Sequence, residues 1–327
     1  MKVGILGGGQ LAQLLTHSAY SLAIQTVHIT ATDLDDILAL ANTCDVLTLE
    51  NENIDIALLR RLAQQMTVYP HFEAVRIAQD RWLEKTFFQN AGIPTTRFTP
   101  VTSLTELDAA ISQIGLPAIL KTRRFGYDGK GQVVIKHRKE AAAALETIGN
   151  GPAILENWIC FDNEVSLIAA RNPAGDIIFY PLIKNTHEAG ILRRSESPYY
   201  NPHLQALAEE YMGRLLTQFE YVGVLAFEFF VVGNTLVANE IAPRVHNSGH
   251  LTLEGFNVSQ FESHLRSIFN LPLIEPILQI PTVMHNIIGT FPPLTRADYL
   301  NCHVYDYGKT ARPGRKLGHI ISLNSTL

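Results

Sequence analysis

Residues 227–240 have the sequence FEFFVVGNTLVANE, in which two runs of apolar β-formers flank a Gly-Asn pair. This pattern is typical of a β-hairpin. Each arm carries one carboxylate, Glu228 or Glu240, and burying an unpaired charge among apolar neighbours costs free energy. A cation is therefore expected between the arms. Carboxylate oxygens suit Mg²⁺, which proteins usually hold with one or two carboxylates and substrate phosphates.

The register of this hairpin decides whether the two carboxylates meet. A strict two-residue turn places Glu228 opposite Asn239 and Glu240 opposite Phe227. A three-residue turn with a bulge places Glu228 opposite Glu240 instead. The sequence leaves both registers open. A hairpin whose edge glutamates face water is a third interpretation, because exposed carboxylates are common.

A cluster of polar side chains follows the hairpin directly. Residues 241–250 read IAPRVHNSGH, so Arg244, His246 and Asn247 come a few residues after Glu240. Beside a metal ion these three side chains would supply hydrogen-bond donors to an anion. We therefore take them as candidate catalytic residues.

The composition describes a chain with large packed cores and a mildly acidic surface. Its 327 residues suit two or three domains, and 46% hydrophobic against 17% charged residues excludes a disordered chain. A net charge of −5 gives no electrostatic footprint for nucleic acid. Local basic clusters in an acidic protein favour a small anionic ligand.

Cysteine usage and hydropathy indicate the compartment. Cys44, Cys160 and Cys302 lie far apart, which argues against a disulfide framework or a zinc site and fits a reducing compartment. The N-terminus enters a glycine turn too early for a signal peptide. No apolar run approaches the roughly 20 residues that span a bilayer. We therefore expect a soluble, cytoplasmic protein with no membrane association.

The chain divides into three predicted domains. Residues 1–95 alternate strands (3–6, 26–30, 46–49, 68–70) with helices (10–20, 54–65, 72–90), which predicts a doubly wound parallel sheet. Residues 96–170 form a small mobile lid subdomain with a helix at 104–114 and a glycine-rich loop at 126–131. Residues 171–327 form a larger α+β domain that contains the hairpin. Its last segment, from about residue 281, carries the cluster Lys309, Arg312, Arg315 and Lys316.

Two glycine-rich turns suggest phosphate binding. Residues 7–12 read GGGQLA, a GxGxxA pattern between strand and helix that is typical of dinucleotide sites, with Asp33 placed for a ribose. No hydride-transfer site accompanies it, so another phosphate ester or none is also open. Residues 121–132 read KTRRFGYDGKGQ, where flexible glycines would close over a triphosphate that Lys121 neutralises. Because Gly131 follows Lys130, this loop is not a Walker A motif, and a solvated turn is the alternative.

Four segments taken together resemble the N5-carboxyaminoimidazole ribonucleotide synthetase family of ATP-grasp enzymes of purine biosynthesis. They read EAVRIAQDR (73–81), GYDGKGQ (126–132), NEIAPRVHNSGH (239–250) and RPGRKLGH (312–319). The resemblance runs along nearly the whole chain and implies an ATP-grasp architecture. It also implies a homodimer that carboxylates 5-aminoimidazole ribonucleotide with bicarbonate, converting ATP to ADP and phosphate.

The resemblance assigns ATP, Mg²⁺ and bicarbonate to matching positions of this sequence. ATP would be bound by Arg81, Lys121, Gly126, Tyr127, Asp128, Gly129, Lys130, Gly131, Glu156, Trp158, Glu164, Asn239 and Glu240. Mg²⁺ would be bound by Glu228 and Glu240. Bicarbonate and the γ-phosphate would be held by Arg244, His246 and Asn247.

The resemblance assigns the ribonucleotide to a second set of residues, with the last two at its 5′-phosphate: Gln10, Leu11, Glu50, Tyr127, Asp128, Lys309 and Arg315. This reassigns the first glycine turn from a dinucleotide to the substrate nucleotide. His187, His285, His303 and His319 show no metal spacing and are taken as structural.

Two departures from the family pattern stand out. Phe125 occupies a position where the family often has glycine, which would stiffen the lid or alter its contacts. Relatives also commonly continue beyond Gly318-His319 for another stretch, whose loss would affect packing or dimerisation more than chemistry. The rival functions are a formate-dependent glycinamide ribonucleotide transformylase, a nicotinamide-binding oxidoreductase and a catalytically silent nucleotide-binding protein. The intact Glu228, Glu240 and Lys121 weigh against the silent protein.

Overall fold

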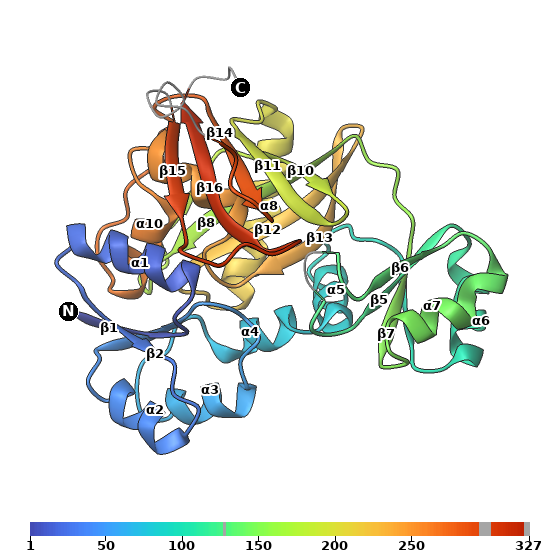
Figure 1. Cartoon of the computed structure of the whole chain (residues 1–327), viewed down its shortest axis with the longest axis horizontal. Helices are drawn as coiled ribbons and strands as arrows, with labels where there is room; N and C mark the ends of the chain where they lie inside the picture. The colour runs from blue at the N-terminus through green and yellow to red at the C-terminus, as the bar shows by residue number, and fades with distance from the viewer. Residues whose placement is uncertain (127–128, 294–301, 324–327) are drawn as a thin grey trace.

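The computed structural model describes residues 1–126, 129–293 and 302–323, so the predictions for Tyr127 and Asp128 lie outside the described residues. Three sheets organise the chain (Figure 1). The N-terminal domain forms one lobe, a small antiparallel sheet with its helices forms a second lobe, and the large sheet lies between them. This arrangement confirms the predicted ATP-grasp architecture of mixed α/β and α+β domains.

The N-terminal domain is a doubly wound parallel sheet, as predicted. It contains β1 (Lys2–Leu6), α1 (Gln10–Ser21), β2 (Gln25–Ile29), α2 (Leu34–Ala41), β3 (Val46–Leu49) and α3 (Ile56–Ala63), with strand order β2-β1-β3. Val3 and Ile5 share one core with α1, whereas Leu6 and Leu47 share another with α2 and α3. Alternate residues of buried parallel strands therefore supply both faces.

The single helix predicted over residues 72–90 is wrong. The structure has two helices, α4 (Phe72–Ala78) and α5 (Arg81–Asn90). Asp80 has an extended backbone, and its carboxylate accepts hydrogen bonds from the amides of Trp82 (3.0 Å) and Leu83 (3.4 Å). An aspartate that caps a new helix in this way interrupts the preceding one even where the apolar periodicity continues.

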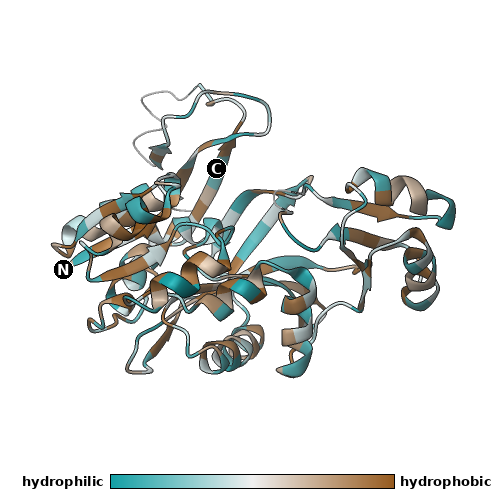
Figure 2. Cartoon of the chain, turned by 90° about the horizontal axis from the view of Figure 1, so that it is seen from below, coloured by the Kyte–Doolittle hydropathy of each residue, from teal (hydrophilic) through white to brown (hydrophobic). Residues whose placement is uncertain are grey.

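The lid subdomain is a four-stranded antiparallel sheet with helices packed against it. It contains β4 (Phe98–Val101), α6 (Leu104–Ile114), β5 (Ala118–Thr122), β6 (Gln132–Ile135), α7 (Ala141–Thr147) and β7 (Ala153–Asn157), with strand order β4-β7-β5-β6. Leu107 and Ile111 of α6 and Leu145 of α7 fill a core of its own with Leu120 and Leu155. The apolar residues of this lobe are visible in Figure 2.

The large domain is built on a nine-stranded sheet with strand order β13-β12-β8-β10-β11-β14-β16-β15, and β9 pairs with β8. Its strands are β8 (Asn163–Arg171), β9 (Ile177–Phe179), β10 (Ile183–Glu188), β11 (Ile191–Ser197), β12 (Gly223–Val232), β13 (Thr235–Ala242), β14 (Thr282–Ile288), β15 (Cys302–Asp306) and β16 (Lys316–Leu323). The predicted domain boundary after residue 170 falls inside β8, which pairs with β12 along its length.

Helices cover both faces of the large sheet. Residues of α8 (Pro202–Gln218) pack in one core, while α10 (Gln260–Ile268) packs in the other together with α1 of the N-terminal domain. The short helix α9 (Thr252–Gly255) precedes α10. In the described part of the chain, no helix is both long and apolar enough to cross a membrane.

Candidate active site

The hairpin of β12 and β13 places Glu228 opposite Glu240. The turn itself has two residues, since Val232 pairs with Thr235, and the register shifts further along, where Phe229 pairs with Ala238 and Glu228 with Glu240. Asn239 is therefore the extra residue of a β-bulge. The observed pairing is one of the two predicted registers, but a bulge inside β13 produces it rather than a longer turn.

The bulge creates a pair of acidic groups that repel each other. Burial and the nearby charge of Glu240 together raise the pKa of Glu228 to about 8. A divalent cation would relieve both effects. The residues fit Mg²⁺, which accepts one or two carboxylates and takes its remaining ligands from phosphates and water. No group of three or more His, Cys, Asp or Glu gathers into a metal site among the described residues.

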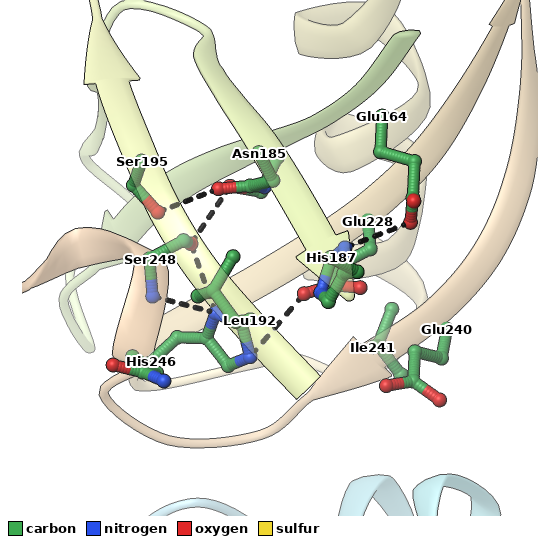
Figure 3. A network of polar contacts seen from close by, with 12 residues as sticks. Glu164, Asn185, His187, Leu192, Ser195, Glu228, Glu240, Ile241, His246 and Ser248 are labelled. Carbon is green, nitrogen blue, oxygen red and sulfur yellow. Dashed lines mark hydrogen bonds and ion pairs between the residues drawn. The ribbon is translucent and has the colours of Figure 1, made fainter. Parts of the chain in front are cut away.

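Two histidines flank Glu228 (Figure 3). His246 Nδ1 accepts a hydrogen bond from the Ser248 amide (3.3 Å), so Nε2 carries the proton that faces Glu228 Oε1 at 3.4 Å. Burial lowers the pKa of His246 to about 3, and the Arg244 charge acts in the same direction, so this imidazole is neutral. Burial opposes charging of His187, but Glu164 at 3.0 Å and Glu228 raise its pKa to about 9. His187 is therefore a cation beside the carboxylates.

Arg244 is fixed by a carboxylate from the N-terminal domain. Its Nε and Nη2 donate to Glu52, and its Nη1 donates to the carbonyl of Val245 (3.0 Å). Burial raises the pKa of Glu52, but Arg244 outweighs this effect and the net pKa is lowered, so the ion pair is charged. Because a guanidinium has five N–H groups and three are used here, two are left to meet an anion in the cavity.

The candidate ATP residues Lys121 and Glu156 form a buried charge network with Lys85. Glu156 Oε1 lies 3.1 Å from Lys121 Nζ, and its Oε2 lies 3.3 Å from Lys85 Nζ. Burial would raise the pKa of Glu156, but the two lysine charges lower it to about 2. This network joins β5 and β7 of the lid to α5.

A cavity of about 900 Å³ lies among the three domains. Many of the predicted site residues line it: Gln10, Leu11, Arg81, Gly126, Lys130, Glu228, Glu240, Arg244, His246, Asn247, Lys309 and Arg315. At one side, Lys309 Nζ donates to Gln10 Oε1 (2.8 Å), and Lys316 contacts Asn247. The structure thus brings residues of both predicted sets into one space.

Other predicted site residues lie outside the lining of this cavity: Glu50, Lys121, Gly129, Gly131, Glu156, Trp158, Glu164 and Asn239. Glu50 accepts hydrogen bonds from the amides of Gly9 (2.7 Å) and Leu11 (3.2 Å). A Cβ at Gly9 would collide with this carboxylate. Since Glu50 occupies the amides that a phosphate would need, the glycine turn is poorly suited to a dinucleotide.

The lid loop shows why glycine is required next to the cavity. A Cβ at Gly129 would collide with the carbonyl of Ala189, so the loop approaches the turn between β10 and β11 closely. Phe125 lines the cavity with a φ of +63°, a left-handed conformation that glycine adopts at lower cost. Phe125 is 69% exposed, and its ring lies beneath the guanidinium of Arg124. This side chain therefore alters the lid surface that faces the cavity.

Sequence reasoning did not predict that four further residues line the cavity: Glu52, Gln79, Glu84 and His187. A position signal exists for Glu52, because it follows the carboxyl end of β3, where open parallel sheets bind ligands. His187 gave no comparable signal. Its charge arises from Glu164 and Glu228, which are remote in sequence.

Comparison with known proteins assigns each region to a described domain type. A ribonucleotide synthetase preATP-grasp domain model matches residues 1–79, an ATP-grasp domain model matches 86–261 and a phosphoribosylaminoimidazole carboxylase C-terminal domain model matches 282–327. Fold and site together define an ATP-grasp ligase.

Similar proteins specify the family. The N5-carboxyaminoimidazole ribonucleotide synthase of Pseudomonas aeruginosa is 45% identical over 98% of this chain and 93% of its own length. The crystal structure of the Thermus thermophilus enzyme superposes with a TM-score of 0.92 at 42% identity, covering 99% of this chain and 94% of the other. The Aspergillus clavatus enzyme, in complex with ADP and the aminoimidazole ribonucleotide, gives a TM-score of 0.90 at 30% identity with the same coverage. The chain belongs to the N5-carboxyaminoimidazole ribonucleotide synthase family.

Proposed function

We propose that this chain uses ATP and bicarbonate to carboxylate 5-aminoimidazole ribonucleotide to N5-carboxyaminoimidazole ribonucleotide in purine biosynthesis. The observation that carries the proposal is the pair Glu228 and Glu240, which shares one cavity with Arg244 and with the cations Lys309 and Arg315. Paired carboxylates suit a metal-bound triphosphate, and the cations suit a substrate phosphate. Relatives that carry this activity in their names match along nearly the whole chain.

The reaction begins with activation of bicarbonate, which is a poor electrophile. A bicarbonate oxygen attacks the γ-phosphorus of ATP, the bond to the bridging oxygen breaks, and ADP leaves as carboxyphosphate forms. The substrate amine then attacks the carboxyl carbon of carboxyphosphate, or CO₂ released from it. Phosphate leaves, and the amine loses a proton. A closed lid would protect the labile intermediate from water.

We assign the reacting end of the cavity to Arg244, His246 and Asn247. The two remaining N–H groups of Arg244 and the Asn247 amide would hold bicarbonate and the γ-phosphate, offsetting the charge of the transition state. The neutral His246 donates its Nε2 proton toward Glu228 and so orients that carboxylate. Mg²⁺ bound by Glu228 and Glu240 would neutralise charge on the phosphate oxygens.

The remaining roles follow the family resemblance. ATP would be bound by Arg81, Lys121, Gly126, Gly129, Lys130, Gly131, Glu156, Trp158, Glu164 and Asn239. The ribonucleotide would be bound by Gln10, Leu11, Glu50, Lys309 and Arg315. We keep the proposed boundary near residue 95, but the lid would end before β8 (Asn163–Arg171), because β8 belongs to the sheet of the large domain. We also propose a cytoplasmic homodimer, for which the resemblance is the support and light scattering of the purified chain is the measurement.

The test is phosphate release from ATP in the presence of Mg²⁺ and bicarbonate, with and without aminoimidazole ribonucleotide. We expect this substrate to stimulate release and the carboxylated product to accumulate. Glycinamide ribonucleotide with formate serves as the control pair, and it should give no stimulation. An enzyme that binds Mg-ATP but responds only to the control pair, or to neither, would contradict the proposal.

A further inference from the structure

The register of the metal hairpin raises the question of what holds the bulge at Asn239. In a strand, neighbouring residues point to opposite faces, so a slip of one residue moves a side chain through the sheet. Without the bulge, Glu240 would pair with Phe227, which is fully buried in the core beneath the sheet. With the bulge, Ile241 takes that place and Glu240 shares the face of Glu228. The metal site therefore depends on one extra backbone residue.

β13 is the edge strand of the sheet, so its outer backbone groups have no strand partner along most of their length. Before the bulge, the backbone amide and carbonyl of Ala238 point away from β12, toward the outer side of the edge strand. Its amide donates to the Pro94 carbonyl (2.7 Å), and its carbonyl accepts from Thr95 Oγ1 (2.8 Å). In a regular strand the backbone groups of every second residue point outward, so the next outward amide would be that of Glu240.

Helix α5 instead meets the groups that only the bulged strand presents. Lys85 Nζ donates to the Asn239 carbonyl (3.1 Å), and Glu84 Oε1 accepts from the Ile241 amide (2.7 Å). Both side chains are nearly inaccessible, with exposed fractions of 1% and 2%. A donor faces the carbonyl and an acceptor faces the amide, so the two adjacent residues complement the bulge and not the regular ladder.

We propose that Glu84 and Lys85 are positioning residues for the metal site, because they hold the bulge that keeps Glu240 on the face of Glu228. Lys85 is in turn held by Glu156 and Thr95 at 3.3 Å each. The same Glu156 contacts Lys121, so the register of the metal carboxylates is tied to the lysine proposed for the ATP phosphates. This inference rests on the proposed metal role of Glu228 and Glu240.

The test compares Glu84→Met with Glu84→Gln. Methionine removes the acceptor at similar volume, whereas glutamine keeps an oxygen for the Ile241 amide. We measure the affinity of Mn²⁺ for the ADP complex by electron paramagnetic resonance and the exchange rate of the Ile241 amide by mass spectrometry. We expect Glu84→Met to weaken Mn²⁺ binding about tenfold, because this factor corresponds to the loss of one buried hydrogen bond. We also expect faster exchange of the Ile241 amide. Glu84→Gln should retain both properties.

Two further variants make each outcome decisive. Glu84 and Lys85 together form a clamp on the bulge. Lys85→Met removes the second residue of this clamp and replaces Glu84→Met if that variant does not fold. Glu240→Gln tests the metal role itself in the same assay. If Glu240→Gln weakens Mn²⁺ binding and a folded clamp variant does not, the clamp is wrong and the metal role stands. If Glu240→Gln leaves Mn²⁺ binding unchanged, the metal role fails and this inference fails with it.

Discussion

Individual carboxylates of this site lower the stability of the ligand-free enzyme, because the fold holds them close to one another. Burial of Glu228 beside Glu240 raises the pKa of Glu228 to about 8, so at neutral pH one proton or one cation must compensate the pair. Glu52 shows the opposite case, because Arg244 compensates its charge within the protein. A carboxylate pair in a cavity, whose repulsion the nearby cations His187 and Arg81 offset only in part, is typical of a ligand-binding site.

We predict that Glu240→Gln raises the stability of the ligand-free enzyme while abolishing turnover. The neutral amide removes the repulsion with Glu228 and keeps the shape of the side chain, so a gain of about 1 kcal/mol is expected. Urea unfolding without ligands measures the gain, and phosphate release measures turnover. Unchanged or reduced stability of the ligand-free variant would show that the two carboxylates do not repel each other as the structure implies.

At the scale of elements, local patterns predicted the structure well where no long-range contact intervened. The helix at 104–114 has the predicted bounds because Ser103 caps it and Gly115 ends it within the same stretch. The hairpin register stayed open, although its signal was present. Leu236, Ala238 and Ile241 of β13 are buried in the same core on one face of the sheet, and the step of three between the last two breaks the period of two. A bulge is the physical reason for such a break.

Other features of the site had no such signal. The partner of Arg244 is Glu52, 192 residues away in the chain, and nothing local marks either as half of a pair. The charge of His187 likewise depends on residues of two other strands. The break between α4 and α5 depends on Asp80, whose carboxylate also binds Arg123 Nε (2.9 Å) and Nη2 (2.6 Å) from the lid. Periodicity alone does not distinguish a capping aspartate from an exposed one.

We predict that Asp80→Ala destabilises the protein by about 1 kcal/mol more than Asp80→Asn. Asparagine is as good a helix cap as aspartate, but it lacks the charge that meets Arg123. Alanine lacks both the cap and the charge. Both variants should be less stable than the wild type, because hydrogen bonds to charged groups contribute roughly 1.5–3 kcal/mol to stability. Urea unfolding gives the comparison. Equal stability of the two variants would mean that the cap of α5 contributes nothing.

At the scale of the whole molecule, the N-terminal domain docks on the large domain through a buried polar contact. His264 of α10 accepts a hydrogen bond from the Val224 amide at Nδ1 (3.0 Å), so its Nε2 carries a proton for Thr48 Oγ1 of β3 (2.7 Å). Helices α1 and α10 pack in one core around this contact. The cavity lies among the domains, so the docking positions Gln10 and Glu52 against Arg244 and Lys309.

Acid should weaken this docking, because burial lowers the pKa of His264 from 6.5 to about 4. The folded protein keeps the imidazole neutral, so its stabilising contribution is complete above the unfolded pKa near 6.5 and is lost as the pH falls toward 4. The shift corresponds to a loss of at most about 3 kcal/mol.

We predict that His264→Gln, whose amide can serve both partners, loses less stability than the wild type between pH 7 and pH 4. Other buried histidines contribute equally to both curves, and replacement of the exposed His17 by Gln is the control that should overlay the wild type. Parallel unfolding curves for His264→Gln and the wild type over this range would show that His264 does not couple protons to domain docking.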